Sequence, residues 1–238
     1  IWYFLVAFMD GGRVMINILY EDNHVLCVVK PANLPVQADN TKDEDLLTLV
    51  KQYLKEKYNK PGNVYLGLVH RLDRPVGGAM ILAKTSKAAS RLSESIRVRD
   101  IDKVYYAILD GVPKKQSDTL VDYLTKDTKT NMVSVTNAKV GKKSILHYQV
   151  LATKNGHTLV EIHLETGRPH QIRVQFASRN LPLVGDQRYN KNAKKVQIAL
   201  WAVSLTFPHP TTKDKITIHS DPPEIWPWTE FEVKLWQK

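Results

Sequence analysis

The stretch V-Y-L-G-L-V-H-R-L-D-R-P-V-G-G-A-M-I-L-A-K, residues 64–84, sets three basic residues and one carboxylate between two apolar runs. The apolar runs predict strands, and the paired glycines before the second run allow a sharp turn and the close approach of another segment. Arg71 and Arg74 flank Asp73, and nearby cations keep a carboxylate ionised. Taken alone, this loop indicates either a structural Arg–Asp bridge or a reactive carboxylate.

Working outward from this loop, short apolar runs alternate with segments of helical periodicity along the chain. Residues 114–143 are polar with short β-like pieces, as expected for loops and hairpins. Because no repeat, low-complexity tract or Gly/Ser linker is present, we predict a single α+β domain with a mixed, mostly antiparallel sheet flanked by helices and loops, although a two-domain split stays open. We predict strands around a turn at 21–24, at 64–69, 79–84, 103–111, 144–153, 158–166 and 196–208, and helices at 43–58, at 86–98 and around Pro169, with Pro169 in the first helical turn.

The chain is strongly basic. Lysine and arginine outnumber aspartate and glutamate by 34 to 24, and the net charge of +10 favours a polyanionic partner. Between Glu165 and Asp214 the one acid is Asp186, so this span could grip phosphates, although a solvated basic surface is the alternative. The basic residues of the span are Arg168, Arg173, Arg179, Arg188, Lys191, Lys194, Lys195 and Lys213.

Cysteine usage and hydropathy limit the class of protein. Cys27 is the single cysteine and no Cys/His pair has zinc-ligand spacing, so we expect no disulfide framework, no metal and a reducing, cytoplasmic location. The apolar N-terminal segment 1–15 is shorter than the ~20 residues of a membrane span, and no basic region precedes it as in a signal peptide. We expect a soluble, unsecreted protein, and two explanations of residues 1–15 stay open: a remnant of expression or unusual numbering.

A second basic cluster lies in T-G-R-P-H-Q-I-R-V, residues 166–174. Helical spacing predicts that His170 and Arg173 share one face, next to a helix N-terminus whose free N–H groups favour anions. Together with Asp73 this gives one acid among bases, in contrast to the two carboxylates that a glycosidase needs. Such a combination suits a nucleophile better than an acid–base pair.

Several motifs, in order, resemble those of one family. H-R-L-D-R is followed by G-x-x-x-x-A-K, K-V-Y-Y-A, T-G-R-P-H-Q-I-R-V, L-P-L-V-G-D and L-x-F-P-H-P. This series resembles the RluA-type pseudouridine synthases over nearly the whole chain, and its joint order and spacing are more specific than any one motif. The resemblance implies the pseudouridine synthase fold for residues 16–238 and isomerisation of specific uridines in structured ribosomal or transfer RNA, without cofactor or metal.

The resemblance also implies roles for single residues. Asp73 matches the catalytic aspartate that attacks the target uridine, after which the base detaches from its ribose, turns and rejoins through carbon. Tyr105 matches the tyrosine that lies against the target base and assists proton removal, and Arg173 matches the basic residue that pairs with the catalytic carboxylate. Leu200 resembles the aliphatic residue on the other side of the pocket, and Arg71 the arginine that holds the place of the flipped-out nucleotide.

Binding of RNA is expected to fall on the catalytic domain itself. Some relatives carry a separate small RNA-binding domain before it, whereas here we expect none, so that Arg168, His170 and the basic region 168–195 would hold RNA. Two departures from the family pattern concern substrate preference: Pro75-Val76-Gly77-Gly78 replaces a Thr-Ser-Gly run, and Trp201 replaces a histidine.

Two other classes of protein stay open. A catalytically degenerate RNA-binding protein is compatible with the altered loop 75–78 and the charge of +10. A metal-dependent nuclease or hydrolase has weak support, because the eight histidines are scattered. The sequence carries no direct signal of oligomeric state, and we expect a monomer.

Overall fold

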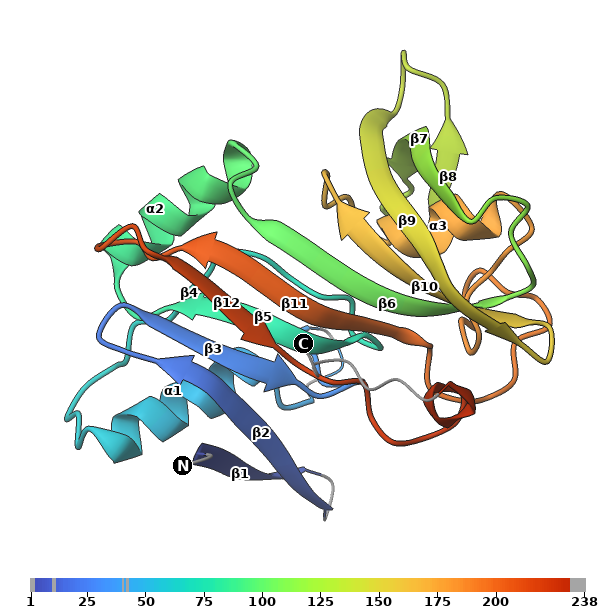
Figure 1. The fold of residues 1–238 in the computed structure, drawn as a ribbon. Coiled ribbons are helices and arrows are strands. Elements are labelled where there is room, and N and C mark those ends of the chain that lie inside the picture. Colours follow the sequence, from blue (N-terminus) through green and yellow to red (C-terminus); the bar gives the residue numbers. More distant parts are fainter. Residues whose placement is uncertain (1–2, 10–11, 40, 42, 232–238) are drawn as a thin grey trace. The chain divides into compact units, whose positions relative to one another are not determined.

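The computed structural model describes residues 3–9, 12–39, 41 and 43–231. The chain divides into two compact units (Figure 1). Unit 1 is made of Ile1–Ile101 and Ala202–Ser220, and unit 2 of Asp102–Trp201 and Asp221–Lys238. Each unit is therefore built from two segments that are distant in the sequence.

Unit 1 is a sheet accompanied by two helices. Its strands pair in the order β1-β2-β3-β5-β11-β12, and β4 pairs with β5. The pairs β1/β2, β2/β3, β3/β5, β4/β5 and β11/β12 are antiparallel. The bounds are β1 Tyr3–Met9, β2 Gly12–Glu21, β3 Val25–Lys30, α1 Leu46–Lys57, β4 Gly67–Leu68, β5 Gly77–Ala83, α2 Ser86–Arg97, β11 Leu200–Pro208 and β12 Lys215–His219, where β11 begins in unit 2.

The two helices of unit 1 lie where their local sequence predicted them. Both begin at a side-chain cap: Asp45 Oδ1 accepts from Thr48 N at 3.1 Å, and Thr85 Oγ1 accepts from Ala88 N at 3.1 Å. The helical period assigns Leu46, Leu49, Val50, Tyr53 and Leu54 to the apolar face of α1. All but Tyr53 are buried, and Tyr53 is half-buried.

The strand predicted at 64–69 is shorter than expected. Only Gly67–Leu68 form β4, which pairs with Ala83 and Leu82 of β5. The neighbours of β5 along the sheet are β3 and β11, so β4 reaches only the end of this strand. The apolar residues that precede β4 thus have no continuous strand edge to pair with.

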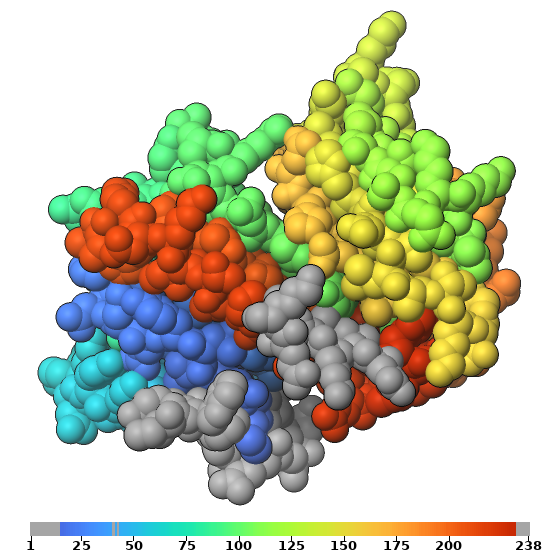
Figure 2. Space-filling view, viewed as in Figure 1, coloured from blue at the N-terminus to red at the C-terminus, as the bar shows by residue number. Residues whose placement is uncertain are grey.

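Unit 2 contains a second run of antiparallel strands in the order β6-β10-β9-β7-β8. The β9–β10 hairpin turns through Asn155 and Gly156, with φ of 52° and 80°, as the K-N-G-H sequence predicted. Residues 137–141, which connect β8 to β9, are largely exposed and project from this unit (Figure 2). The bounds are β6 Asp102–Asp110, β7 Ser117–Lys126, β8 Val133–Thr136, β9 Lys142–Lys154, β10 His157–Leu164, α3 Gln171–Ala177 and a 3₁₀ turn at Trp228–Glu230.

Helix α3 begins later than predicted. Pro169 lies before the helix, which starts at Gln171, and the expectation that Pro169 occupies the first turn is therefore wrong. His170 takes a left-handed conformation with φ of 51°, which breaks helical geometry at that residue. Gln171 N donates to Arg168 O at 3.1 Å and closes a tight turn in front of the helix.

The α+β class and the mostly antiparallel strand pairing are confirmed. In the part of the chain that the structure describes, no helix is long and apolar enough to cross a membrane.

Candidate active site

Asp73 lies in the loop between β4 and β5 of unit 1 and is half-buried. Val76 N donates to the backbone carbonyl oxygen of Asp73 at 3.0 Å and closes a turn that begins at Asp73. At the start of the loop, His70 Nε2 accepts from Ile81 N at 3.0 Å, so the loop is tied back onto β5. The backbone that carries Asp73 is thereby held at both ends.

Gly78 explains part of the unusual P-V-G-G sequence of this loop. Its φ is +122°, and a Cβ added there would lie 2.3 Å from the carbonyl oxygen of Ala202 on β11. Only glycine fits such a close approach of two backbones. The role predicted for the paired glycines, a sharp turn and close packing, is confirmed for Gly78.

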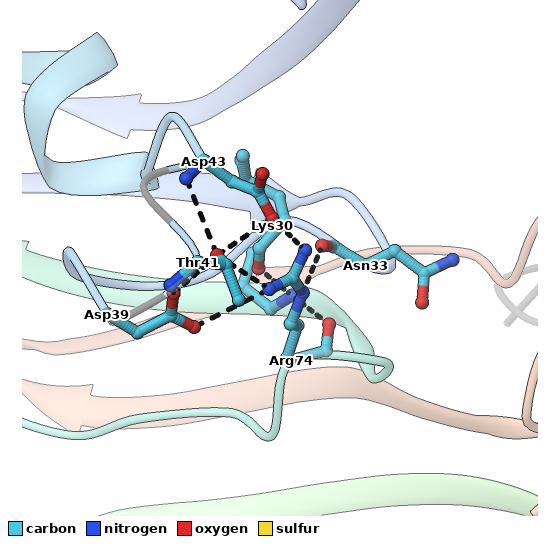
Figure 3. Close-up of polar contacts among 7 residues, drawn as sticks. Lys30, Asn33, Asp39, Thr41, Asp43 and Arg74 are labelled. Atoms are coloured by element: carbon cyan, nitrogen blue, oxygen red, sulfur yellow. Dashed lines mark hydrogen bonds and ion pairs between the residues drawn. The ribbon is translucent and has the colours of Figure 1, made fainter. Parts of the chain in front are cut away.

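Arg74 does form a structural bridge, but with acids other than its sequence neighbour. Its guanidinium pairs with Asp43 through Nη2 and lies 3.5 Å from Asp39 Oδ2 through Nη1. Figure 3 shows Arg74 surrounded by residues of the 33–43 segment. Further bonds run from Nη1 to Thr41 Oγ1 at 3.1 Å and from Nε to Asn33 O at 3.2 Å. Arg74 therefore joins the Asp73 loop to the 33–43 segment.

Lys30, the last residue of β3, is fully buried and clamps the same loop. Its Nζ donates to the carbonyl oxygens of Pro31 at 2.8 Å, Leu34 at 2.8 Å and Arg74 at 3.0 Å. An ammonium group has three protons, so each proton has one acceptor. The clamp joins the end of β3, the turn after it and the residue next to Asp73.

Burial sets the protonation of this lysine. Desolvation lowers the pKa of Lys30 to about 7, the nearby Asp73 carboxylate raises it in part, and Arg74 lowers it further. The sequence motifs did not point to Lys30. The available signal was a lysine that ends the apolar run V-L-C-V-V and is followed at once by proline.

In unit 2, Tyr105 is buried on β6, on the face of the sheet that α3 covers. Cross-strand partners share a face, and Tyr105 pairs with Ile162, which pairs with Tyr148. The Tyr148 ring meets the ring of Phe176 on α3 edge to face, with centroids 5.4 Å apart. Tyr105 thus lies on the helix-covered side of this sheet, as does every second residue of β6.

Arg173 is buried on α3 and forms a two-pronged ion pair with Asp186. Its Nε and Nη2 lie 2.8 and 2.7 Å from Asp186 Oδ2 and Oδ1, and the side chains are 5% and 0% exposed. The guanidinium also lies 5.1 Å from the centre of the Tyr189 ring. Asp186, the one acid of the basic span, was noticed in the sequence but given no role. Pairing of Arg173 with Asp73 concerns two different units and stays a prediction.

His170 and Arg168 lie in the turn that precedes α3. His170 Nδ1 is 2.6 Å from Tyr189 OH, so His170 and Arg173 contact the same tyrosine. His170 lies outside the helix, however, and the prediction that His170 and Arg173 share one helical face is therefore wrong. Arg168 is exposed, and its Nε donates to Lys143 O at 3.2 Å.

The remaining predicted residues are placed as follows. Leu200 and Trp201 are buried at the start of β11, directly after Ala199, whose carbonyl accepts from Ile108 N of β6 at 3.0 Å. Arg71 is exposed in the Asp73 loop, and among the described residues it makes no hydrogen bond or ion pair. Asp73 and Arg71 thus belong to unit 1, and the other predicted site residues to unit 2.

Comparisons with known proteins point in one direction. The family model described as RNA pseudouridylate synthase matches residues 24–178. Ribosomal large subunit pseudouridine synthase D of Xanthomonas campestris is 32% identical over 228 residues, 89% of this chain and 67% of that protein. The protein of the same name from Vibrio cholerae is 33% identical over 236 residues, 90% of this chain and 70% of that protein.

Solved structures share the fold. Human RNA Pseudouridylate Synthase Domain Containing 4 superposes with a TM-score of 0.74 at 21% identity, over 87% of this chain and 88% of that one. Human RNA Pseudouridylate Synthase Domain Containing 1 gives a TM-score of 0.70 at 21% identity, over 88% and 84% of the two chains.

Proposed function

The chain belongs to the RNA pseudouridylate synthase family, and we propose that it converts specific uridines of large-subunit ribosomal RNA to pseudouridine with Asp73 as the nucleophile. Membership makes the protein an RNA pseudouridine synthase, an isomerase. The choice of ribosomal RNA rests on the names of the relatives, each a ribosomal large subunit enzyme.

The reaction needs no added atoms. The bond between N1 of uracil and C1′ of the ribose breaks, a bond between C5 and C1′ forms, the proton on C5 leaves and N1 ends protonated. The protein must therefore supply a nucleophile, hold the detached base and move protons. A uridine stacked in an RNA helix must first be extruded, which costs a few kcal/mol.

The proposal assigns these tasks to the predicted residues. Asp73 attacks the extruded nucleotide, and Tyr105 packs against the uracil and assists removal of the C5 proton. Leu200 supplies the apolar wall, and Arg173 keeps the Asp73 carboxylate charged and directed. Arg71, exposed and without a protein partner among the described residues, occupies the place of the extruded nucleotide.

The observation that carries the proposal is the fixed backbone around Asp73. Lys30 Nζ holds the Arg74 carbonyl at 3.0 Å, and the Arg74 side chain bonds the 33–43 segment. A nucleophile must be held near its target atom, and misplacement by about 1 Å can cost ~100-fold in rate. Two independent anchors on the residue after Asp73 fit such a demand better than a loop with a purely structural carboxylate.

RNA binding draws on Arg168, His170 and the basic region 168–195. Because Arg173 is used internally by Asp186, we assign direct contact with RNA to the exposed members, among them Arg168, rather than to the whole span.

The test is incubation of the purified protein, in chelator, with unmodified large-subunit ribosomal RNA and with transfer RNA. Pseudouridine is mapped by carbodiimide-blocked primer extension, with Asp73→Asn as the matched control. We expect a new block in ribosomal RNA with the unmutated protein and none with Asp73→Asn, while the two proteins bind RNA equally.

Turnover by Asp73→Asn would remove the nucleophile assignment. A block confined to transfer RNA would replace the substrate, and salt-sensitive binding without any block would favour the catalytically degenerate RNA-binding protein.

A further inference from the structure

Lys103 on β6 differs from the other sequestered lysines of this protein. Lys30 Nζ has three carbonyl acceptors, and Lys84 Nζ lies 2.9 Å from Glu21 Oε1. Lys103 is half-buried, yet across the described ranges its Nζ makes no hydrogen bond and no ion pair. The side chain as a whole is only half-buried, so solvent still reaches part of it.

The position of Lys103 relates it to Tyr105. The two residues are two apart on one strand, so their side chains leave β6 on the same face. That face is the one on which Tyr105, Ile162 and Tyr148 lie and which α3 covers. Lys103 is nearer to the start of the strand, at the end of this face.

The ammonium group lies against the turn T-G-R at 166–168. A Cβ built on Gly167 would be 3.6 Å from Lys103 Nζ. The turn is rigid, because Gln171 Oε1 accepts from Thr166 Oγ1 at 2.8 Å and from Arg168 N at 3.0 Å. Gly167 and Arg168 are both exposed. The Lys103 ammonium group and Arg168 are therefore both next to the exposed backbone of Gly167.

Two acids close in sequence to this turn, Glu165 and Glu161, are already engaged. Glu165 Oε1 bonds His147 Nε2 at 2.7 Å. Glu161 on β10 bonds His163 Nε2 at 2.8 Å and Tyr106 OH at 3.4 Å, and its pairing with Tyr106 places it on the opposite face from Lys103. Within the part of the chain that the structure describes, Lys103 thus forms no ion pair with an acid.

An uncompensated, partly desolvated cation is a cost to folding, and desolvation does lower the pKa of Lys103. A methionine of similar length would fit the same place without that cost. Because the lysine costs stability where a methionine would not, its presence indicates that an anionic ligand compensates the charge of Lys103 when it binds.

We propose that Lys103 and Arg168, across Gly167, bind one phosphate of the RNA backbone next to the uridine that Tyr105 contacts. The position of the uridine next to Tyr105 is taken from the function proposed above. The role of Lys103 concerns RNA binding rather than the chemical step. Lysine acts here as a point charge for a phosphodiester oxygen, and the open glycine leaves room for that oxygen.

The first experiment compares Lys103→Met with Lys114→Met, which removes the same charge from an exposed lysine of unit 2. Affinity for a large-subunit ribosomal RNA transcript is measured by filter binding over a range of salt, together with the melting temperature. We expect Lys103→Met to weaken binding about tenfold at low salt and to reduce the slope of log affinity against log salt by about 0.7–0.9, the value of one lost phosphate contact. Its melting temperature should equal or exceed that of the unmutated protein.

A second variant tests the geometry. The φ of Gly167 is outside the left-handed region, and among the described residues a methyl group there would meet Lys103 Nζ alone, at the ordinary contact distance of 3.6 Å. Gly167→Ala should therefore fold normally while covering the ammonium group. We expect it to weaken RNA binding as Lys103→Met does, with no further loss in the double variant.

The assay separates this proposal from the function above, because binding is read without turnover and stays measurable if no pseudouridine forms. Equal affinity and equal salt slopes for Lys103→Met and Lys114→Met would overturn it. A fall of several degrees in the melting temperature of Lys103→Met would overturn it too, since the cation would then be structural. If RNA binding by the unmutated protein did not depend on salt, the proposal would also be overturned.

Discussion

Replacement of Lys30 by methionine tests whether the clamp on the Asp73 loop stabilises the protein. Methionine has a similar length and no proton to donate, so the carbonyl oxygens of Pro31, Leu34 and Arg74 lose donors now 2.8, 2.8 and 3.0 Å away. A buried acceptor that loses its donor costs about 1–3 kcal/mol, while removal of the buried ammonium relieves its desolvation. The two effects oppose each other, and we expect the free energy of unfolding to fall by about 2–4 kcal/mol.

The pH dependence of that difference gives a sharper test. Burial lowers the pKa of Lys30 from its ordinary value of 10.5 to about 7. Between these two values the unfolded chain binds more protons than the folded one, so the contribution of Lys30 to the free energy of unfolding rises with pH, by on the order of 1 kcal/mol per pH unit. The contribution is lost as pH falls through 7. The stability gap between the unmutated protein and Lys30→Met should therefore widen from about pH 6 to about pH 9.

The assay is urea unfolding followed by tryptophan fluorescence at three pH values, with Lys87→Met as control because Lys87 is an exposed lysine on α2 of the same unit. A gap that is the same at low and high pH would refute the titration argument, and no gap at any pH would refute the clamp. In single-turnover assays Lys30→Met should slow isomerisation by ~100-fold with RNA affinity unchanged, because the loop that carries Asp73 loses an anchor.

Two further ion pairs give predictions of the same kind. Arg173→Met or Asp186→Asn alone removes one side of this buried ion pair and should cost about 3–5 kcal/mol in urea unfolding. The double variant should cost clearly less than the sum, and additive losses would contradict a direct pair. Burial raises the pKa of Glu21, but hydrogen bonds from Lys57 and Lys84 outweigh it and lower the pKa to about 2. The stabilisation that ionised Glu21 provides is complete above the ordinary pKa of 4.5 and is lost as pH falls toward 2. Glu21→Gln should therefore have a lower melting temperature than the unmutated protein at neutral pH and the same melting temperature in acid. A difference in melting temperature that persists at pH 2 would contradict this.

The elements that sequence predicted well are those whose causes are local. α1 and α2 carry their own caps, Asp45 and Thr85, and the apolar period of α1 marks its buried face. β4 was overpredicted because the length of a strand depends on the edge that it meets, and β5 is already lined by β3 and β11. α3 was placed too early because His170 is left-handed and contacts Tyr189 OH, 19 positions later, which helical spacing in the sequence does not reveal.

The candidate site shows the same division. Motif order named Asp73, Tyr105 and Arg173 as candidates, and their roles stay predictions. Their partners were not predictable in this way, because Lys30 reaches the Arg74 carbonyl over 44 positions and Asp186 reaches Arg173 over 13. A sequence shows that an acidic residue lies among basic ones, but only the fold shows with which basic residue it forms an ion pair.

The number of basic residues therefore does not by itself show which of them are available to bind RNA; the contacts that each one makes within the protein must be considered. Arg173 pairs with Asp186 and Arg179 with Asp122 at 2.8 Å, and the Arg188 guanidinium donates to a backbone carbonyl. These arginines of the basic span therefore have contacts within the protein. Arg71 and Lys103, which lie outside the span, have no acid or hydrogen-bond partner among the described residues. A cation already paired must break a contact before it can bind a phosphate, whereas an unpaired one gains the full interaction. Selectivity for RNA should therefore depend more on Arg71 and Lys103 than on the arginines that dominate the count.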